Sequence, residues 1–433
     1  MSHDFAAAHS TRPFLAGCTS LILSLQFAAC ESAASAGAFD LDALPRLAAT
    51  AGTRIGDVDD PDIGFSRVYG LDVDRDGQLY VFEGVDMQIR VYSPDGRLLR
   101  RIGGRGAGPG EFENAPRFGV VGDTIWAYDG FARRITLFRR DGSLLSASGR
   151  TSEITIPLPS CYGYVTPWSM RPDGLFSSDF GRVACSRTDP ETSVREGDSI
   201  PVPRVVFDAT GAIVDTIGWE ASPPPRMVPP PGASPARFQS IEVAGRRLMV
   251  PDPPTTLAYW IPLDDGRLIV DTPLPVDAGS GSLTVTRLDL DRDTVYNHRF
   301  HYQPARYTDA ELDAVAARAS RGGFGMEPAG AGGGTPPPAD PAAQRALREA
   351  MTFPEFKLPI GFVLVDADQR LWLSRAVPDG APPRWIILGT DGMALGEVEL
   401  PARSRYLWSS GSSFWALEPD DLDVPWLVQY LVD

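Results

Sequence analysis

Positive charge in this sequence comes almost entirely from arginine, because Lys357 is the only lysine. The 40 Lys and Arg residues are outnumbered by 56 Asp and Glu residues, which gives a net charge of −16. Binding to nucleic acid depends on a basic face that neutralises phosphates. The charge balance therefore argues against nucleic acid as a partner, and equally against adsorption to anionic lipid.

Histidine is nearly as scarce, with 4 residues in all. Beyond the N-terminal region only His298 and His301 remain, three positions apart on an expected strand. Side chains at that spacing on a strand face opposite sides. A histidine-rich zinc centre is therefore excluded.

The sequence has one N-terminal apolar run, PFLAGCTSLILSLQFAA at 13–29, with Arg12 ahead of it and Cys30 behind it. It is too short for a stable membrane span and indicates a secretory signal. The stretch FAAC resembles a bacterial lipoprotein processing box, which implies cleavage before Cys30 and acylation of its sulfur. Simple secretion and a buried core helix are the alternatives. We expect a signal peptide at 1–29, a flexible tether at 30–45, and an extracytoplasmic, periplasmic or envelope protein that meets the membrane only through its lipid.

Cysteine is also sparse, and Cys18 would be removed with the signal. The exported body would then keep Cys161 and Cys185 in an oxidising compartment. We predict a disulfide between them, with two free buried thiols as the alternative.

Against these absences, glycine and proline are plentiful, with 43 and 40 residues, which predicts many turns and few long helices. Six segments share one pattern, a short apolar strand, a tight polar turn and a second strand rich in aromatic or β-branched residues. They are VYGLDVDRDGQLYVFE, FGVVGDTIWAYD, PWSMRPDGLFSSD, LAYWIPLDDGRLIVD, GFVLVDADQRLWLS and RYLWSSGSSFWALE.

A second hairpin follows the first in five of these units, whereas the last unit ends with the lone strand PWLVQYLVD. Its missing partner resembles AATAGTRIGDV at 48–58. Six units of four strands, the last completed by the N-terminal segment, predict an all-β six-bladed β-propeller over 46–433. Closing the ring in this way removes an exposed sheet edge.

Two units carry insertions. The first, at 219–240, is rich in proline and is expected to be extended. The second, at 303–353, contains two helical patterns, one N-capped at Thr308 or Asp309 and one over PAAQRALREAM, around a stretch expected to be disordered. A fixed cap over one propeller face and a mobile lid over a ligand site are both open interpretations of these helices.

The stretch GGRGAGPGEFENAPRFGV at 103–120 resembles the boundary signature of NHL repeats, a G-x-G-P-G-[EQ]-F turn between blades. The resemblance implies that Phe112 fills the gap between two blades. The chain from about 45 to 433 is similar to bacterial six-bladed propeller lipoproteins related to NHL proteins, and no settled activity follows from that likeness.

The second strand of each unit ends on a polar residue, which gives a recurring set of candidate binding residues at the mouth of the central channel: Glu83, Asp129, Asp179, Asp271, Arg375 and Glu418. Such a ring could bind a cation or an amine. The competing interpretation is that strand ends need turn-forming, solvated residues, which a chain with 56 acids supplies anyway.

Enzymatic classes find little support in the residues present. The NHL-like amidating lyases use several histidines around zinc, and beyond the N-terminal region this chain has only His298 and His301. The propeller lactonases hold calcium with Glu, Asn and Asp. The only asparagines in this sequence, Asn114 and Asn297, are expected in a turn and an outer strand. Calcium bound by oxygens of Glu83, Asp129 and Asp179 stays possible. We therefore predict a non-enzymatic binding or scaffold protein without a cofactor, for a protein, peptide or carbohydrate. A divalent-cation-dependent lyase or lactonase-like hydrolase with its site in the central channel is the alternative.

Overall fold

Polar turns connect the strands of each hairpin, and the turn at 74–78 shows how the sequence stabilises them. In the computed structural model Asp74 Oδ1 accepts hydrogen bonds from the backbone N–H groups of Asp76 (2.9 Å) and Gln78 (3.0 Å), and Gly77 has a φ of 77°. The aspartate thus satisfies the turn's amides while glycine takes the left-handed conformation that other residues disfavour. The structure describes residues 39–433 except 58, 61–62, 115, 148–153, 159–160, 179–181, 186–200, 222–236, 244–245, 253–255, 276, 321–340, 352 and 378–380.

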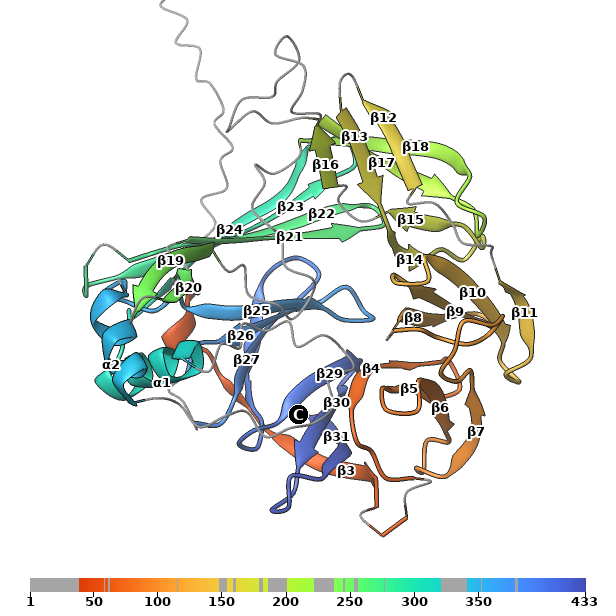
Figure 1. Cartoon of the computed structure of the whole chain (residues 1–433), viewed down its shortest axis with the longest axis horizontal. Helices are drawn as coiled ribbons and strands as arrows, with labels where there is room; N and C mark the ends of the chain where they lie inside the picture. The colour runs from red at the N-terminus through yellow and green to blue at the C-terminus, as the bar shows by residue number, and fades with distance from the viewer. Residues whose placement is uncertain are drawn as a thin grey trace, which may run out of the picture. The chain divides into compact units, whose positions relative to one another are not determined.

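The predicted six-bladed propeller of four-stranded antiparallel blades is confirmed (Figure 1). Blade 1 consists of β4 (Val68–Val73), β5 (Leu79–Glu83), β6 (Gln88–Tyr92) and β7 (Leu98–Ile102). Blade 2 consists of β8 (Arg117–Val121), β9 (Thr124–Asp129), β10 (Arg134–Arg139) and β11 (Leu144–Ala147). Blade 3 consists of β14 (Pro167–Met170), β15 (Phe176–Ser178), β17 (Pro201–Phe207) and β18 (Ile213–Ala221). Blade 4 consists of β21 (Thr256–Leu263), β22 (Gly266–Pro273), β23 (Gly281–Asp289) and β24 (Thr294–Tyr302). Blade 5 consists of β25 (Ile360–Val365), β26 (Leu371–Arg375), β27 (Arg384–Leu388) and β28 (Ala394–Glu399). Blade 6 consists of β29 (Arg405–Ser410), β30 (Ser413–Pro419), β31 (Pro425–Val432) and β3 (Ala49–Ile55).

The N-terminal segment closes the ring as predicted. Strand β3 pairs antiparallel with β31, and the register places Arg54 opposite Val428 and Ile55 opposite Leu427. Ile55 is buried in a cluster that also contains Leu427 and Leu79, so it contacts both the last blade and the first. Closure thus joins the two ends of the chain through backbone hydrogen bonds and apolar packing.

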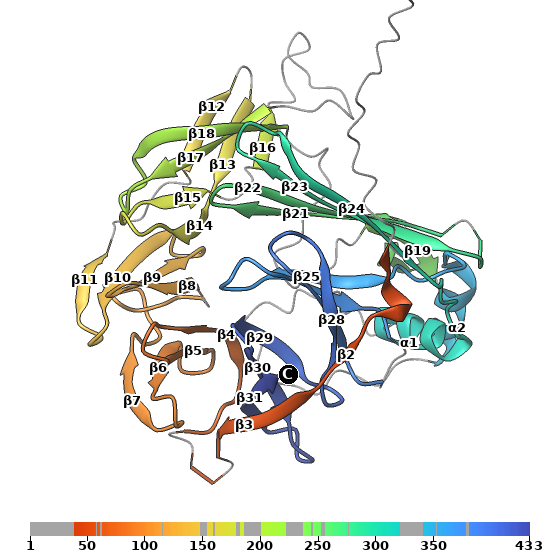
Figure 2. The ribbon, with the colours of Figure 1, turned by 180° about the vertical axis from the view of Figure 1, so that it is seen from behind.

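Before it reaches β3, the same segment crosses two other blades, which the sequence did not predict. Strand β1 (Phe39–Asp40) pairs in parallel with β24, and β2 (Arg46–Leu47) pairs in parallel with β28, with the 3-10 helix η1 (Leu41–Ala43) between them. Figure 2 shows this strap running past β28 to β3. Residues 39–45, expected in the tether, are therefore strap residues, while the predicted signal peptide, Cys30 and the rest of the tether lie outside the described residues.

Three further elements lie in insertions between blades or, for one strand, between the second and third strands of blade 3. A three-stranded sheet consists of β12 (Ile154–Leu158), β13 (Cys161–Val165) and β16 (Arg182–Cys185), and a hairpin of β19 (Arg237–Val243) and β20 (Arg246–Asp252). The insertion before β25 holds α1 (Asp309–Ser320) and α2 (Pro341–Ala350), as the two helical patterns predicted. Most of the proline-rich insertion and the stretch expected to be disordered lie outside the described residues. Among the residues described, neither α-helix has the length and apolar character needed to cross a bilayer.

Thr308 is the N-cap of α1, one of the two predicted candidates. Its hydroxyl accepts a hydrogen bond from the Glu311 N–H at 3.3 Å, and the Glu311 carboxylate accepts from the Thr308 N–H at 2.9 Å. This reciprocal pair is a capping box. Glu311 also forms an ion pair with Lys357, the sole lysine, which fastens α1 to the segment that leads into blade 5.

The glycine-rich boundary turn lies between blades 1 and 2. Phe112 is buried there and contacts the rings of Phe82 on β5 and Phe138 on β10. Gly103, with a φ of 80°, passes so close to Phe112 that an added Cβ would lie 2.4 Å from the ring. The phenylalanine therefore fills the gap between the two blades, as the NHL resemblance implied.

We predict that Cys161 and Cys185 form a disulfide in the exported protein. The register places the two residues directly opposite each other on β13 and β16, where antiparallel partners have Cα atoms about 4.5–5.5 Å apart, within the range of disulfides. Peptide mapping without reductant should recover the linked pair, and Cys161→Ser should lower the free energy of unfolding by about 3 kcal/mol. Cys185→Ser should have the same effect, and the double variant should cost no more than either. Quantitative alkylation of both thiols in native exported protein would contradict the pairing.

Candidate functional site

The predicted binding residues that the structure describes lie on the face that carries the blade-to-blade connections and the turns between second and third strands. This face is named here the connection face. In an antiparallel blade the first strand starts and the second strand ends at the same edge. Hydrogen bonds join the starts of neighbouring inner strands on this face. Arg117 Nη1 donates to the Pro167 carbonyl at 2.8 Å, and the Tyr259 hydroxyl donates to the Gly361 carbonyl at 2.5 Å.

Glu83, at the end of β5, is a clamp between two backbone segments. Its Oε1 accepts hydrogen bonds from the N–H groups of Ser66 (3.2 Å) and Arg67 (2.8 Å), which precede β4. Its Oε2 accepts from Val85 (2.8 Å) and Asp86 (3.0 Å) in the turn that follows. The side chain is 1% exposed. Both oxygens therefore serve to hold the turn and the incoming connection together.

Asp129, at the end of β9, repeats this arrangement in blade 2. Its Oδ2 accepts from the N–H groups of Glu113 (2.7 Å) and Asn114 (3.0 Å), and its Oδ1 accepts from Phe131 (2.9 Å) and Ala132 (3.0 Å). The residue is 2% exposed. Four N–H groups already point at the two oxygens that a cation would need, so this environment favours backbone amides over a metal ion.

The other predicted positions do not share one role. Asp271 is exposed on β22, Glu418 is half-buried and accepts a hydrogen bond from the Tyr430 hydroxyl, and Asp179 lies outside the described residues. Arg375 donates to the Leu41 carbonyl at 2.9 Å and forms an ion pair with Asp42, so it holds the strap. Within the described parts of the chain, no three His, Cys, Asp or Glu side chains are grouped to share a metal ion.

Asp72 is a half-buried carboxylate that no sequence pattern predicted as part of a site. It lies on β4 and links three inner strands, since its Oδ2 accepts from the Val120 N–H of blade 2 (2.7 Å) and its Oδ1 from the Trp408 indole of blade 6 (3.1 Å). Burial raises the pKa of Asp72 to about 6, against the opposing effect of these hydrogen bonds. Its position in an alternating strand, without any motif, gave no signal in the sequence.

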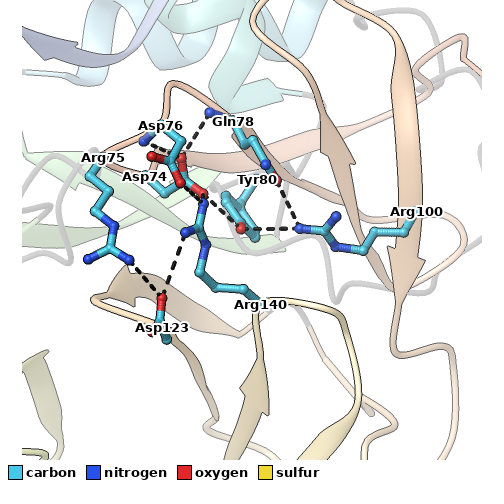
Figure 3. Close-up of polar contacts among 8 residues, drawn as sticks. All are labelled: Asp74, Arg75, Asp76, Gln78, Tyr80, Arg100, Asp123 and Arg140. Atoms are coloured by element: carbon cyan, nitrogen blue, oxygen red, sulfur yellow. Dashed lines mark hydrogen bonds and ion pairs between the residues drawn. The ribbon is translucent and has the colours of Figure 1, made fainter.

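A second missed cluster lies at the opposite end of blades 1 and 2 (Figure 3). Arg140 donates to Asp76 at 2.6 Å and to Asp74, and it lies 3.7 Å from Asp123, which also pairs with Arg75 at 3.1 Å. The hydrogen bond to Asp76, together with the neighbouring acceptors, raises the pKa of the Arg140 guanidinium. With Arg100, which donates to Gln78 at 2.9 Å, three arginines face three aspartates in this cluster, and the cluster ties the first hairpin of blade 1 to blade 2.

Blade 5 is linked to the next blade in the same way, by an aspartate in its first hairpin turn that accepts from different side-chain donors. Asp366 Oδ2 accepts from the Trp372 indole at 3.0 Å and from the Ser409 hydroxyl of blade 6 at 3.1 Å, as Asp74 accepts from Tyr80 and Arg140. The shared sequence pattern is Asp-x-Asp-x-x-Leu-aromatic. The pattern could have been found in the sequence, although its link to the next blade could not.

Exposed apolar side chains mark the turns of three consecutive blades on the connection face. Leu422, Val85 and Phe131, in the turns of blades 6, 1 and 2, are 76%, 54% and 70% exposed. Each turn then has a residue in the left-handed region, namely Asp423, Met87 and Arg133. These tips are presented by fixed turns and have no catalytic chemistry of their own.

We predict that Glu83 and Asp129 stabilise the fold and that the exposed Asp271 does not. Glu83→Gln or Asp129→Asn places an amide nitrogen against backbone N–H donors, so each should lower the free energy of unfolding by about 2–4 kcal/mol. Asp271→Asn, exposed and two residues before the end of β22, should change it by less than about 0.5 kcal/mol. Urea unfolding of the three variants makes the comparison, and equal losses in all of them would contradict the clamp role.

We predict a pH-dependent contribution to stability from Asp72. Because its folded pKa is raised to about 6, the folded state holds the proton more tightly than the unfolded state does. The resulting stabilisation is present below the unfolded pKa near 4 and is lost as pH rises through about 6. The difference in unfolding free energy between wild type and Asp72→Asn, measured by urea unfolding, should therefore decline over this window. A flat difference would contradict the assignment, and Asp271→Asn serves as the control.

No family model matches the chain, and no curated protein matches it in sequence. Among solved structures it is similar to a Bacteroides fragilis protein assigned as exported, with 13% identity over 89% of this chain and 95% of that one, at a TM-score of 0.43. It is also similar to a DUF4221 family member from Bacteroides vulgatus (11% identity, 89% and 98% covered, TM-score 0.34) and to virginiamycin B lyase from Staphylococcus aureus (10% identity, 89% and 99% covered, TM-score 0.33). Identity at this level places the chain in none of these groups.

Proposed function

We propose that the chain is an exported, lipid-anchored binding protein of the cell envelope that performs no catalysis and uses its connection face to hold a protein, peptide or carbohydrate. The observation that supports this proposal best is that the carboxylates at the strand ends hold backbone turns. Glu83 and Asp129 are buried, and each accepts four backbone hydrogen bonds, so they fix turns that present Val85 and Phe131 to solvent. A rigid surface with exposed apolar side chains is suited to recognition.

Export and anchoring are supported by the apolar run at 13–29 that ends at Cys30. The register of Cys161 and Cys185 is compatible with export, because it would allow a cross-strand disulfide in an oxidising compartment. The strap begins at Phe39, which leaves 31–38 between Cys30 and the first strand. Cys30 is thus separated from the propeller by a short linker of small and polar residues.

The anchor is tested by expressing the full chain in a bacterium and analysing its mature N-terminus by mass spectrometry. We expect an acylated N-terminal Cys30, membrane-fraction retention of the wild type, and release of Cys30→Ala into the soluble fraction. A mature N-terminus elsewhere, or Cys30→Ala remaining in the membrane fraction, would overturn the anchor.

A divalent-cation-dependent lyase or lactonase-like hydrolase is the second candidate, and Asp72 is the observation that favours it. A half-buried carboxylate with a pKa of about 6 among the inner strands could act as a general base near neutral pH. The discriminating assay uses a panel of lactones and esters with and without Ca²⁺. Our proposal expects no turnover above that of Asp72→Asn. Turnover that depends on both Ca²⁺ and Asp72 would overturn the binding function.

A further inference from the structure

We infer that a cleft between blades 5 and 6 binds a small neutral molecule with an aliphatic body and one hydrogen-bond acceptor. The cleft lies at the end of the propeller opposite the connection face, where the turns between first and second strands are found. Its volume of about 300 Å³ is at the lower end of the range typical of small-molecule sites, about 300–1,000 Å³. The site is separate from the connection face, so the inference goes beyond the proposed function.

Three parts of the chain form the walls of the cleft. Blade 5 contributes side chains from β26, β27 and β28, blade 6 contributes the turn at 411–413 and Val432 on β31, and the strap contributes Leu47. Leu47 is held against β28, because a Cβ added to Gly396 would lie 2.6 Å from the Leu47 Cγ. The cleft is therefore complete only when the N-terminal segment has closed the ring.

The apolar walls are mainly aliphatic. They consist of Leu47, Ile387, Leu395 and Val432, together with Trp372. Leu395 is 47% exposed, whereas Trp372 is 1% exposed and offers no free ring face for stacking. These walls therefore favour contact with an aliphatic chain over stacking on a sugar or an aromatic ring.

Hydrogen-bond donors of blade 6 also line the cleft. Ser413 Oγ accepts a hydrogen bond from Gln429 Nε2 at 2.9 Å, so its own O–H is left to donate. Ser412 is exposed, and its hydroxyl forms no hydrogen bond with another described residue. Both hydroxyls can donate to a carbonyl oxygen of a ligand.

The turn that carries these serines is fixed before a ligand arrives. Asp368 Oδ2 accepts from the Gly411 N–H at 2.5 Å, and Asp368 Oδ1 accepts from the Ser410 hydroxyl at 3.3 Å. The Ser412 carbonyl accepts from the Val432 N–H at 2.7 Å. Little conformational entropy is therefore lost when the turn contacts a ligand.

Arg370 is the charged residue of the lining, and its charge is already balanced. Its Nε donates to Asp366 Oδ2 at 2.7 Å, and its Nη2 lies 2.7 Å from the same oxygen. Asp366 also accepts from the Trp372 indole, the Ser409 hydroxyl and two turn amides, so its oxygens are saturated. An ammonium group in the cleft would meet Arg370 without a free carboxylate in the lining, which disfavours a cationic ligand.

The charges around the lining disfavour an anionic ligand. The neighbouring bases are Arg46, Arg375 and Arg384, and the neighbouring acids are Asp42, Asp368, Asp391, Glu397, Glu399 and Asp433. The acids outnumber the bases, and each of these arginines is ion-paired, as Arg46 is with Glu397 at 3.2 Å. A carboxylate would be repelled here, whereas a neutral carbonyl can accept from the serine hydroxyls without that cost.

The test compares octanamide, octanoate and octylammonium, which have similar alkyl chains and different head groups, by isothermal titration calorimetry on the folded protein. We expect octanamide to bind several-fold more tightly than either ion, because it offers an acceptor without a charge. Hexanamide, which is shorter by two methylene groups, should bind about tenfold more weakly than octanamide.

Leu395→Asp tests the location, because it places a carboxylate in the aliphatic wall, and it should weaken octanamide binding at least tenfold. Leu145→Asp is the matched control. Leu145 is 45% exposed and occupies the equivalent bulge in blade 2, since the register of β10 and β11 skips it as the register of β27 and β28 skips Leu395. The control should bind octanamide like wild type, and thermal melts of the two variants should agree.

The double variant Ser412→Ala with Ser413→Ala tests the donors and removes no apolar contact. It should weaken octanamide binding several-fold, because the ligand carbonyl loses its hydrogen bonds. This variant provides the test of the site if Leu395→Asp fails to fold.

Three results would overturn the inference. No saturable binding of octanamide up to its solubility limit would refute the site. Equal binding by wild type, Leu395→Asp and the double serine variant would refute its location, and tighter binding of octanoate or octylammonium would refute the neutral class. None of these results concerns the connection face or the turnover assay, so failure of this site is distinguishable from failure of the proposed function.

Discussion

The interaction on which this propeller depends is the hydrogen bond from backbone N–H groups at strand ends to a side-chain carboxylate. A ring of short strands has many ends, and every buried amide there needs an acceptor. Glu83 and Asp129 satisfy four amides each on the connection face. Asp74 and Asp366 accept from two turn amides each at the opposite end of their blades, and they also bind side chains of the next blade. The excess of acids, 56 against 40 basic residues, thus has a structural use that requires neither a metal nor a cationic ligand.

Closure imposes a second constraint, and the strap shows how it is met. A propeller joined only by its last blade would leave the outer edges of the other blades open to pairing. Here β1 and β2 cover the outer edges of blades 4 and 5 before β3 completes blade 6, so one N-terminal segment contributes to three consecutive sheets. Arg375 fixes this path through the Leu41 carbonyl and Asp42. The same arginine was expected to bind a ligand, and its actual contacts depend on a residue 333 positions away in the sequence.

The fold could be predicted because its units are local. A hairpin such as that around Gly77 is encoded in adjacent residues, and the repetition of six such hairpins implies the ring. The strap could not be predicted, since two-residue strands have no detectable period. The site was harder for a related reason. Glu83 and Asp271 both follow apolar second strands in the sequence, but Glu83 ends β5 and meets four amides, whereas Asp271 lies two residues before the end of β22 and is exposed. Whether such a carboxylate meets backbone amides depends on where the preceding connection passes. Asp72 gave no signal because its partners, Val120 and Trp408, come from two other blades.

Function in such a ring has to come from departures from its symmetry. The six blades share one strand order, and apart from the strap strands on blades 4 and 5 they differ most in their connections. The connections into blades 3, 4 and 5 carry β12 and β13, the β19–β20 hairpin and the two helices, and β16 lies in the turn between the second and third strands of blade 3. The connections into blades 6, 1 and 2 are short and contain no such element among the described residues. Leu422, Val85 and Phe131 project from the blades with short connections, where no inserted element covers them. Exposed apolar side chains cost solubility, and the clamps hold these three in fixed turns at the surface. A partner that contacts these three side chains would approach blades 6, 1 and 2, which makes the short connections, rather than the insertions, the place where recognition is to be sought.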